Sequence, residues 1–385
     1  MLVEVEVTDL TVGMYLVEII KPKGKFQLHE PGLIKKDKTI TLLKKRGVEI
    51  VLIDPEKAQI VPEKKTSTQQ KKSFKEEIAQ AKAVFDESKN IQKKLFYAAE
   101  NGSPLDLSSV NLITDESIEL IFNNPDALAC VLNLRNKDEY LLEHSVAVSV
   151  LITLFAFHLK LDKEIVRKLA VGAFLHDVGK IMVPDSILNK PGKLTDPEFE
   201  VMKSHASYSI EIIENTPGID PLSLEVAALH HEQLSGNGYP NGIKDISVYG
   251  RMIAICDIYD ALTSTRCYKE GMSQVRAFGI LRNLVKINHL DEELVAQFIH
   301  CMGVYPVGSI VQLESNRLAI VESQNPGSSL LPTVTTFYNL GAKGFELEEK
   351  IDLATSKTEH IAKCVRADDF DLDMKQIIEY LAHQG

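Results

Sequence analysis

The stretch AFLHDVGK, residues 173–180, decides the fold of this chain. Its apolar first half is typical of a buried helix, and a histidine and an aspartate follow directly. Adjacent side chains at a helix end point about 100° apart, so His176 and Asp177 can both reach one cluster, where a carboxylate can bridge two cations. Gly179 is expected to end the helix. The stretch therefore predicts a buried helix whose end carries metal ligands.

Other histidines and a buried aspartate stand in similar settings on either side of this stretch. His144 opens the run EHSVAVSV, His205 lies in VMKSHASYS, and His230 and His231 are adjacent in ALHHEQLSGNGYP. Asp257 lies inside RMIAICDIYDAL, which is apolar on nearly all sides of the expected helix. A lone carboxylate buried there is costly unless it is paired or bound to a metal. Metal ligation explains its position.

The donor set indicates the kind and number of the ions. Neutral imidazoles and carboxylates without a thiolate suit iron, manganese, nickel or zinc better than calcium or magnesium alone. The potential ligands are too many for one tetrahedral ion, so we expect two ions, held by His144, His176, Asp177, His205, His230, His231 and Asp257. Two ions about 3.5–4 Å apart suit phosphodiester hydrolysis, because they activate water and neutralise the charge that grows on the phosphate.

Composition excludes several classes of protein. The net charge of −11 argues against a broad basic face for a nucleic-acid polymer, so an anionic small molecule would need local cations. Lys180, Arg266 and Lys269 are candidate phosphate partners. The five cysteines are scattered without a CxxC pair, and the acidic start MLVEVEVTDL is unlike a signal peptide. We therefore expect a cytoplasmic protein without membrane insertion.

The 385 residues are enough for two or three domains of about 100–200 residues each. Short β-prone runs fill the first part, a Lys- and Gln-rich stretch follows, helical patterns dominate the centre, and β-prone runs return after Tyr305. The expected fold class is multidomain α+β, with an all-α catalytic domain. We expect a strand-rich domain at residues 1–60 and a linker with a connecting helix at 61–114. The helical domain is expected at 115–305, and a β-rich extension with a final helix at 306–385.

Two helical segments need separate interpretation. The apolar run VAVSVLITLFAF, residues 146–157, is shorter than the roughly 20 residues that span a bilayer, so it predicts a buried helix. Residues 74–99 show helical periodicity without Pro or Gly. They predict either a connecting helix or a dimerisation arm.

Taken together, these motifs resemble the HD-GYP domain, a branch of the HD phosphohydrolase superfamily. The matching elements are the His of EHS, the HD pair of HDVGK, the stretch NKPGKLTDPEFEVMKSH, the run from HHE to GYP, and RMIAICDIYDALTSTRCYK. They occur in family order across residues 137–305. The resemblance implies a cyclic di-GMP phosphodiesterase that yields pGpG and can go on to GMP, with iron or manganese in a helical domain.

The resemblance also implies individual roles. The seven ligands would be those given above, Asp177 would bridge the ions, and catalysis would involve His176, Asp177 and Lys180. Substrate contacts would come from the cations and the GYP turn, namely Lys180, Gly238, Tyr239, Pro240, Arg266 and Lys269. The segment VTDLTVGMYLVEI resembles a small domain of uncertain function that often precedes HD-GYP domains, and YPVGSIVQL resembles the tail that often follows them.

Two positions depart from the family pattern. The family usually places an Asp three residues after the Glu of HHE, and Ser235 holds that position here. This replacement can weaken a hydrogen bond that fixes the loop. Members with three metals place a Glu one helical turn before the first His, and Tyr140 holds that position here, which favours two ions. A cyclic-dinucleotide binding module with little catalysis remains an alternative, as does a hydrolase of mixed cyclic GMP-AMP or of a nucleoside polyphosphate. Homodimer formation and partner signalling proteins stay open.

Overall fold

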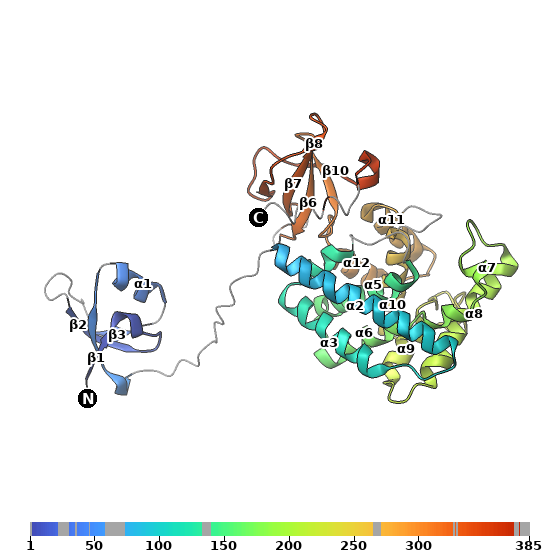
Figure 1. The fold of residues 1–385 in the computed structure, drawn as a ribbon, viewed down its shortest axis with the longest axis horizontal. Helices are drawn as coiled ribbons and strands as arrows, with labels where there is room; N and C mark the ends of the chain where they lie inside the picture. Colours follow the sequence, from blue (N-terminus) through green and yellow to red (C-terminus); the bar gives the residue numbers. More distant parts are fainter. Residues whose placement is uncertain are drawn as a thin grey trace. The chain divides into compact units, whose positions relative to one another are not determined.

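Strands and helices in the computed structural model follow the sequence pattern (Figure 1). The described residues are 2–21, 31–34, 37–45, 47–57, 74–132, 140–264, 271–325, 328, 330–372 and 377. The chain divides into two compact units, Met1–Lys71 and Lys72–Gly385. The expected α+β class is confirmed. Strands β1–β4 belong to the first unit, and the second unit consists of helices followed by strands β5–β10. The domain limits expected from the sequence remain predictions.

The first unit is a small antiparallel sheet with one helix. Its strands pair in the order β1-β4-β2-β3. The alternating burial along IVLI directs Val51 and Ile53 into a core that Leu16, Ile19 and Ile40 complete. The elements of this unit are β1 (Val3–Glu6), β2 (Tyr15–Lys21), β3 (Gly32–Leu33), α1 (Asp37–Lys45) and β4 (Ile50–Ile53).

Helices make up most of the second unit. Several begin at residues typical of helix starts: Asp106, Asp220, Ser247 and Asp291 each accept a backbone N–H with their side chains. The helices are α2 (Phe74–Glu100), α3 (Leu107–Asn123), α4 (Pro125–Leu132), α5 (Tyr140–His158), α6 (Lys163–Leu175), α7 (Asp185–Leu188), α8 (Asp196–Glu214), α9 (Pro221–Leu229), α10 (Val248–Thr263), α11 (Gln274–Lys286) and α12 (Glu292–Met302).

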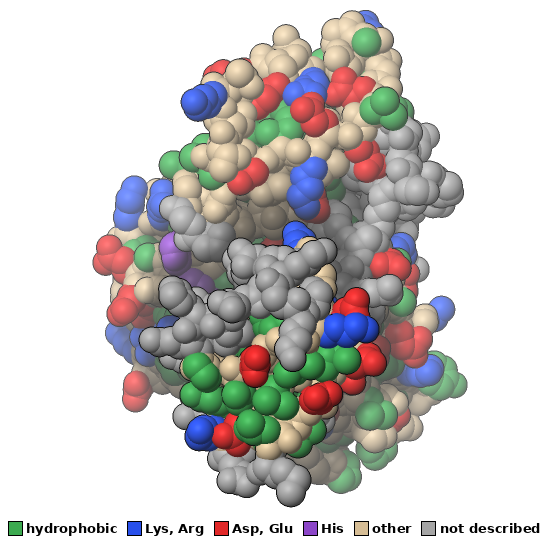
Figure 2. Space-filling model, turned by 90° about the vertical axis from the view of Figure 1, so that its left-hand side faces the viewer, with side chains coloured by type: hydrophobic (Ala, Val, Ile, Leu, Met, Phe, Trp, Pro, Cys, Tyr) green, Lys and Arg blue, Asp and Glu red, His purple; other side chains and the backbone are tan. Residues whose placement is uncertain are grey.

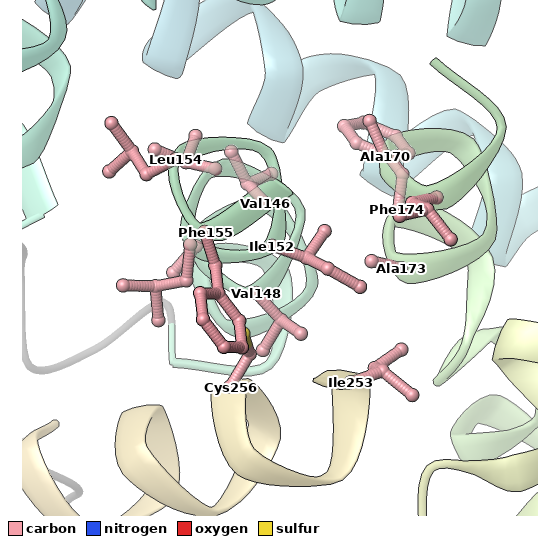
Figure 3. Close-up of a cluster of buried hydrophobic side chains, with 14 of the residues drawn as sticks. Val146, Val148, Ile152, Leu154, Phe155, Ala170, Ala173, Phe174, Ile253 and Cys256 are labelled. Carbon is pink, nitrogen blue, oxygen red and sulfur yellow. The ribbon is translucent and has the colours of Figure 1, made fainter. Parts of the chain in front are cut away.

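The centre of this helical body is α5, which is apolar on all sides. Figure 3 shows Ile152 of α5 on the side that faces α6, which carries Ala173, and Phe155 of α5 pointing toward Cys256 of α10. A helix surrounded in this way buries side chains on every face, which explains why its sequence lacks an amphipathic period. The arrangement fixes the end of α6 and the middle of α10 on the two sides of α5.

The same helix satisfies the length and composition of a membrane span. Among the described residues, Leu141–His158 is the window that does so, and 78% of it is buried inside the protein. Core helices of water-exposed domains satisfy this test as well. The structure therefore confirms the buried helix expected from residues 146–157.

The helix α2 belongs to the helical body. Val84, Phe85, Leu95 and Phe96 are buried in the main core, and the Gln92 amide donates to the carbonyl oxygen of Phe174. The sequence predicts a connecting helix or a dimerisation arm for residues 74–99. One face of α2 packs in the core of the second unit, and the two alternatives stay predictions. The expected start of the helical domain at residue 115 also falls inside α3, which packs in the same core.

A six-stranded antiparallel sheet follows the helices, as the β-prone runs predict. Its order is β10-β5-β6-β7-β8, with β9 paired to β7, and its core joins Cys130 of α4. The strands are β5 (Ile310–Leu313), β6 (Arg317–Ser323), β7 (Thr333–Asn339), β8 (Gly344–Phe345), β9 (Lys350–Asp352) and β10 (Ile361–Val365). Apart from Ile377, the expected final helix at residues 373–384 lies outside the described residues.

Candidate metal centre

The seven expected ligands come from five helices or helix ends and converge in one place. His144 lies on α5, His205 on α8 and Asp257 on α10. The two adjacent pairs lie just beyond the last residues of α6 and α9. All but His231 are buried, and the His231 side chain is 22% exposed. The sequence thus identifies residues that the fold brings together.

One group consists of His144, His176 and Asp177, which offer ligand atoms within 4.8 Å of one another. Asp177 Oδ2 lies 3.4 Å from His144 Nε2 and 3.3 Å from His176 Nε2. Asp257 Oδ1 lies 2.9 Å from His144 Nε2 and 3.8 Å from His176 Nε2. Two imidazoles and two carboxylate oxygens therefore surround one small volume.

A second group consists of His205, His230 and His231, also within 4.8 Å of one another. The Nε2 atom of His205 lies 3.4 Å from that of His230 and 3.1 Å from that of His231. Nitrogen atoms that meet in this way repel one another unless a proton or a cation lies between them. The second group therefore also has the form of a cation site.

Two carboxylates connect the groups. The Oδ2 atom of Asp177 faces the first group, while its Oδ1 lies 3.4 Å from His205 Nε2 and 3.9 Å from His230 Nε2. Asp257 is similar: its Oδ1 faces the first group and its Oδ2 lies 3.6 Å from His231 Nδ1. Each carboxylate therefore has one oxygen toward each group, as a bridging ligand requires.

The imidazole rings are fixed by bonds on their far nitrogens. The Nδ1 atoms of His176, His205 and His230 donate to the carbonyl oxygens three residues earlier, at 2.6–2.7 Å. His144 Nδ1 lies 2.7 Å from Asp260 Oδ2. These bonds set the tautomer that leaves an Nε2 lone pair directed into the centre.

Burial and neighbouring charges shift the pKa values in the direction that metal binding needs. Burial lowers the pKa of His205 and, more strongly, of His230, and it lowers the pKa of His231 to about 3. Burial alone would raise the pKa of Asp177, but its interactions with His176 and with the Lys180 ammonium hold that pKa well below its usual range. Neutral imidazoles and an ionised carboxylate are the protonation states that bind a metal.

The His144 ring behaves differently in the metal-free arrangement. Burial would lower its pKa, but hydrogen bonds to Asp257 and Asp260 outweigh burial and raise it. A proton on the His144 ring supplies the positive charge that a bound cation would otherwise supply beside Asp257 and Asp260. The buried atoms His176 Nε2 and Asp177 Oδ1 make no hydrogen bond within the described part of the chain. The donor set and these two atoms fit a pair of transition-metal ions.

The expected substrate residues divide into two sets. The Lys180 ammonium contacts Asp177 Oδ2 and is 15% exposed, so it lies at the edge of the centre. The Tyr239 ring lies 4.5 Å from that of His231, and Pro240 follows it in the same loop. Arg266 and Lys269 lie outside the described residues.

Several neighbouring residues have roles that the sequence motifs do not indicate. A Cβ at Gly238 would lie 2.5 Å from the backbone of Glu232, so glycine lets the GYP turn close on that residue. The buried Glu232 carboxylate accepts N–H groups from Asn241, Gly242 and Ile243, which holds the same loop. Ser235 accepts the N–H of Asn237 at 3.3 Å and so makes a local turn instead of a contact with the ligands.

One detail differs from the expectations. Gly179 does not end α6, which stops at Leu175; it lies in a 3-10 turn, where a Cβ would be 2.3 Å from His205 O and Ser209 N. Close packing against α8 therefore explains this glycine. Asp260 contacts His144, and its spacing of three residues from Asp257 on one helix places both on the same side. Asp260 is therefore a partner of a ligand, and the sequence does not place it among the expected ligands.

A family model described as an HD domain matches residues 130–294, and a domain of unknown function matches residues 2–110. A cyclic di-GMP phosphodiesterase of Pseudomonas aeruginosa is 32% identical over 372 residues, which cover 92% of this chain and 89% of that protein. The chain belongs to the HD-GYP branch of the HD-domain family.

Other known proteins are similar to part of the chain. A cyclic di-GMP phosphodiesterase of Thermotoga maritima is 33% identical over 204 residues, which cover 50% of this chain and 55% of that protein. A 3'3'-cGAMP-specific phosphodiesterase of Vibrio cholerae is 34% identical over 190 residues, 48% of this chain and 35% of that protein. An HDGYP protein of Bdellovibrio bacteriovorus shares the fold with a TM-score of 0.50 at 19% identity, covering 77% and 98% of the two chains.

Proposed function

We propose that this chain is a metal-dependent phosphodiesterase that hydrolyses cyclic di-GMP to pGpG, and further to GMP. The observation that carries the proposal is the pair of ligand groups joined by Asp177, with one carboxylate oxygen toward each group. The relative from Pseudomonas aeruginosa, which aligns along nearly the whole chain, is a cyclic di-GMP phosphodiesterase and supports this substrate.

The proposed centre holds two divalent transition-metal ions, with iron or manganese favoured and nickel or zinc as alternatives. The ligands would be His144, His176, Asp177, His205, His230, His231 and Asp257, with Asp177 bridging. When bound, the ions would supply Lewis acidity toward the phosphate and an activated water. Imidazole and carboxylate donors without a thiolate support ions of this class.

The chain's own residues would bind and orient the diester. Lys180, which already contacts Asp177, would place its ammonium beside a phosphate oxygen. Tyr239 would hold the substrate beside His231. His176 and Asp177 would act in catalysis as ligands, and the remaining substrate contacts would come from Gly238, Pro240, Arg266 and Lys269.

The proposal includes a cytoplasmic location and excludes nucleic-acid polymers as partners. Cys130, Cys256, Cys301 and Cys364 are free thiols, as expected in a reducing compartment. On the face in Figure 2, blue and red side chains of the described residues are interspersed, without a continuous basic surface. Such a surface suits a small anionic ligand held by local cations.

Hydrolysis of mixed cyclic GMP-AMP is the second candidate. The Vibrio cholerae relatives that act on 3'3'-cGAMP match about half of this chain at 34% identity. They share the helical domain, so substrate choice within this branch depends on residues around the centre. Competition between the two dinucleotides would decide between the candidates.

Product chromatography tests the proposed function. The full chain, loaded anaerobically with iron or with manganese, should release pGpG from cyclic di-GMP. The double variant His176→Ala with Asp177→Ala should release none, while His300→Ala, which changes an exposed histidine on α12, should match the native chain. Binding of the dinucleotide without product under either metal would contradict the proposal and favour a binding module.

A further inference from the structure

The metal centre opens toward solvent on one side. His144, His176, Asp177 and His230 are at most 1% exposed, whereas the His231 side chain is 22% exposed. The Tyr239 ring lies against His231, with centroids 4.5 Å apart and planes at 35°. A phosphodiester that reaches the ions must therefore place its remaining groups beside this tyrosine.

Two residues of α8 extend the surface beyond Tyr239. Phe199 is 45% exposed, and its ring meets the Tyr239 ring edge-on at 6.5 Å. Lys203 lies one helical turn further along α8, with its ammonium 5.2 Å from the Phe199 centroid and 5.7 Å from the Tyr239 centroid. The described residues thus place two aromatic rings and a cation together beside the exposed histidine.

We propose that Phe199 and Lys203 form the surface that recognises a guanine base of the substrate. This inference rests on the proposed function and assigns its specificity. Phe199 stacks on the base, since an exposed aromatic ring next to a phosphate site offers a π-face to any nucleobase. Lys203 donates to the base edge.

Lys203 provides the selectivity for guanine. Guanine presents two acceptors on one edge, O6 and N7, whereas adenine presents N7 and an amino donor there. An ammonium group has three donors and no acceptor, so it suits guanine and is poorly matched to the adenine amino group. Its flexible stem allows it to follow a base stacked on Phe199.

The present partner of Lys203 can be exchanged. Its ammonium lies 2.7 Å from Glu200 Oε1, and the Glu200 side chain is 69% exposed. The Lys203 side chain is 29% exposed. A pair whose carboxylate faces solvent contributes little free energy, so a guanine edge can replace the carboxylate. Val201, also on α8 and 40% exposed, makes no ring contact among the described residues and serves as a matched control.

Steady-state kinetics of the metal-loaded full chain with cyclic di-GMP and cyclic di-AMP test the inference. Phe199→Ala should raise KM for cyclic di-GMP about tenfold with kcat within about twofold, because stacking is equally present in the ground and transition states. Phe199→Trp should restore KM. Lys203→Met should reduce the preference for cyclic di-GMP over cyclic di-AMP about tenfold. Val201→Ala, with unchanged metal content, should match the native chain.

The outcomes separate this inference from the proposed function. Unchanged KM in Phe199→Ala and unchanged preference in Lys203→Met would overturn the inference while hydrolysis by the native chain upholds the function. If the native chain releases no pGpG, the function fails, and equilibrium dialysis of cyclic di-GMP decides the inference. Equal Kd for the native chain and Phe199→Ala, or no binding by either, would overturn it.

Discussion

Four of the five imidazoles at the centre have a partner at the nitrogen that points away from it. Three rings use backbone carbonyls, which no side-chain substitution removes, but His144 uses the carboxylate of Asp260. Ser264 Oγ also donates to Asp260 Oδ2 at 3.0 Å. A mutation of Asp260 can therefore change how His144 binds a metal while the His144 side chain itself stays unaltered.

Asp260→Asn should weaken metal binding about 10–100-fold, because a neutral amide supports the basicity of His144 less than a carboxylate does. Competition with a chelator of known affinity measures the change. Asp220→Asn, which alters a helix start away from the centre, is the control. An affinity within twofold of the native value would show that Asp260 only fills space.

The adjacent ligand pairs could be predicted from the sequence because they occupy helix ends in an apolar setting. His176, Asp177, His230 and His231 all lie where the sequence indicates. Asp260 is not among the expected ligands, and its contact with His144 depends on the packing of α5 against α10. Such contacts between distant elements leave no local pattern.

The turn after α6 packs closely against α8. A Cβ at Gly179 would lie 2.3 Å from His205 O and from Ser209 N, and neither backbone atom can move unless α8 moves. The helix α8 carries His205, so packing at this glycine also positions a ligand. The absence of a side chain at Gly179 therefore affects both the packing of α8 and the position of His205.

Gly179→Ala should lower the free energy of unfolding by about 1–3 kcal/mol, since overpacking forces the backbone apart. Urea denaturation measures the loss, and metal content should fall with it. Gly279→Ala on α11 is the control, because nothing lies within 4 Å of the added Cβ and alanine favours a helix. Equal midpoints for both variants would contradict the packing role.

The boundaries between elements were harder to predict than their type. The strands after residue 306 and the long central helix follow the hydrophobic pattern. The pattern of residues 74–99 predicts either a connecting helix or a dimerisation arm. Periodicity shows that one face of the helix is apolar but not what covers that face. In the structure, α2 contacts α5, which lies far from it along the chain. The Lys89 ammonium of α2 lies 3.3 Å from Glu143 Oε1 of α5.

In the second unit as a whole, the helical body and the terminal sheet share a junction at α4. Burial raises the pKa of Asp126 to about 6, although an N–H of Gln324, just after β6, acts against burial. The charge of Glu77 on α2 also raises this pKa. Three elements therefore meet around a carboxyl group that titrates in a mildly acidic range.

The stability of the protein should depend on pH through this group. Because the folded pKa exceeds the unfolded value of 3.8, the folded state binds the proton more tightly, so stability present near pH 4 is lost as the pH rises to about 6. Asp126→Asn should remove on the order of 2 kcal/mol of this change. Urea midpoints of both proteins across pH 4–7 measure it. A difference between them that is constant with pH would contradict the assignment.

The two groups of ligands that Asp177 joins would hold two ions. Anomalous diffraction at the iron edge, from crystals of the full chain loaded anaerobically, locates them. Two peaks are predicted, one beside His144 and His176 and the other beside His205, His230 and His231, with Asp177 between them. A single peak, or peaks away from these residues, would contradict the account.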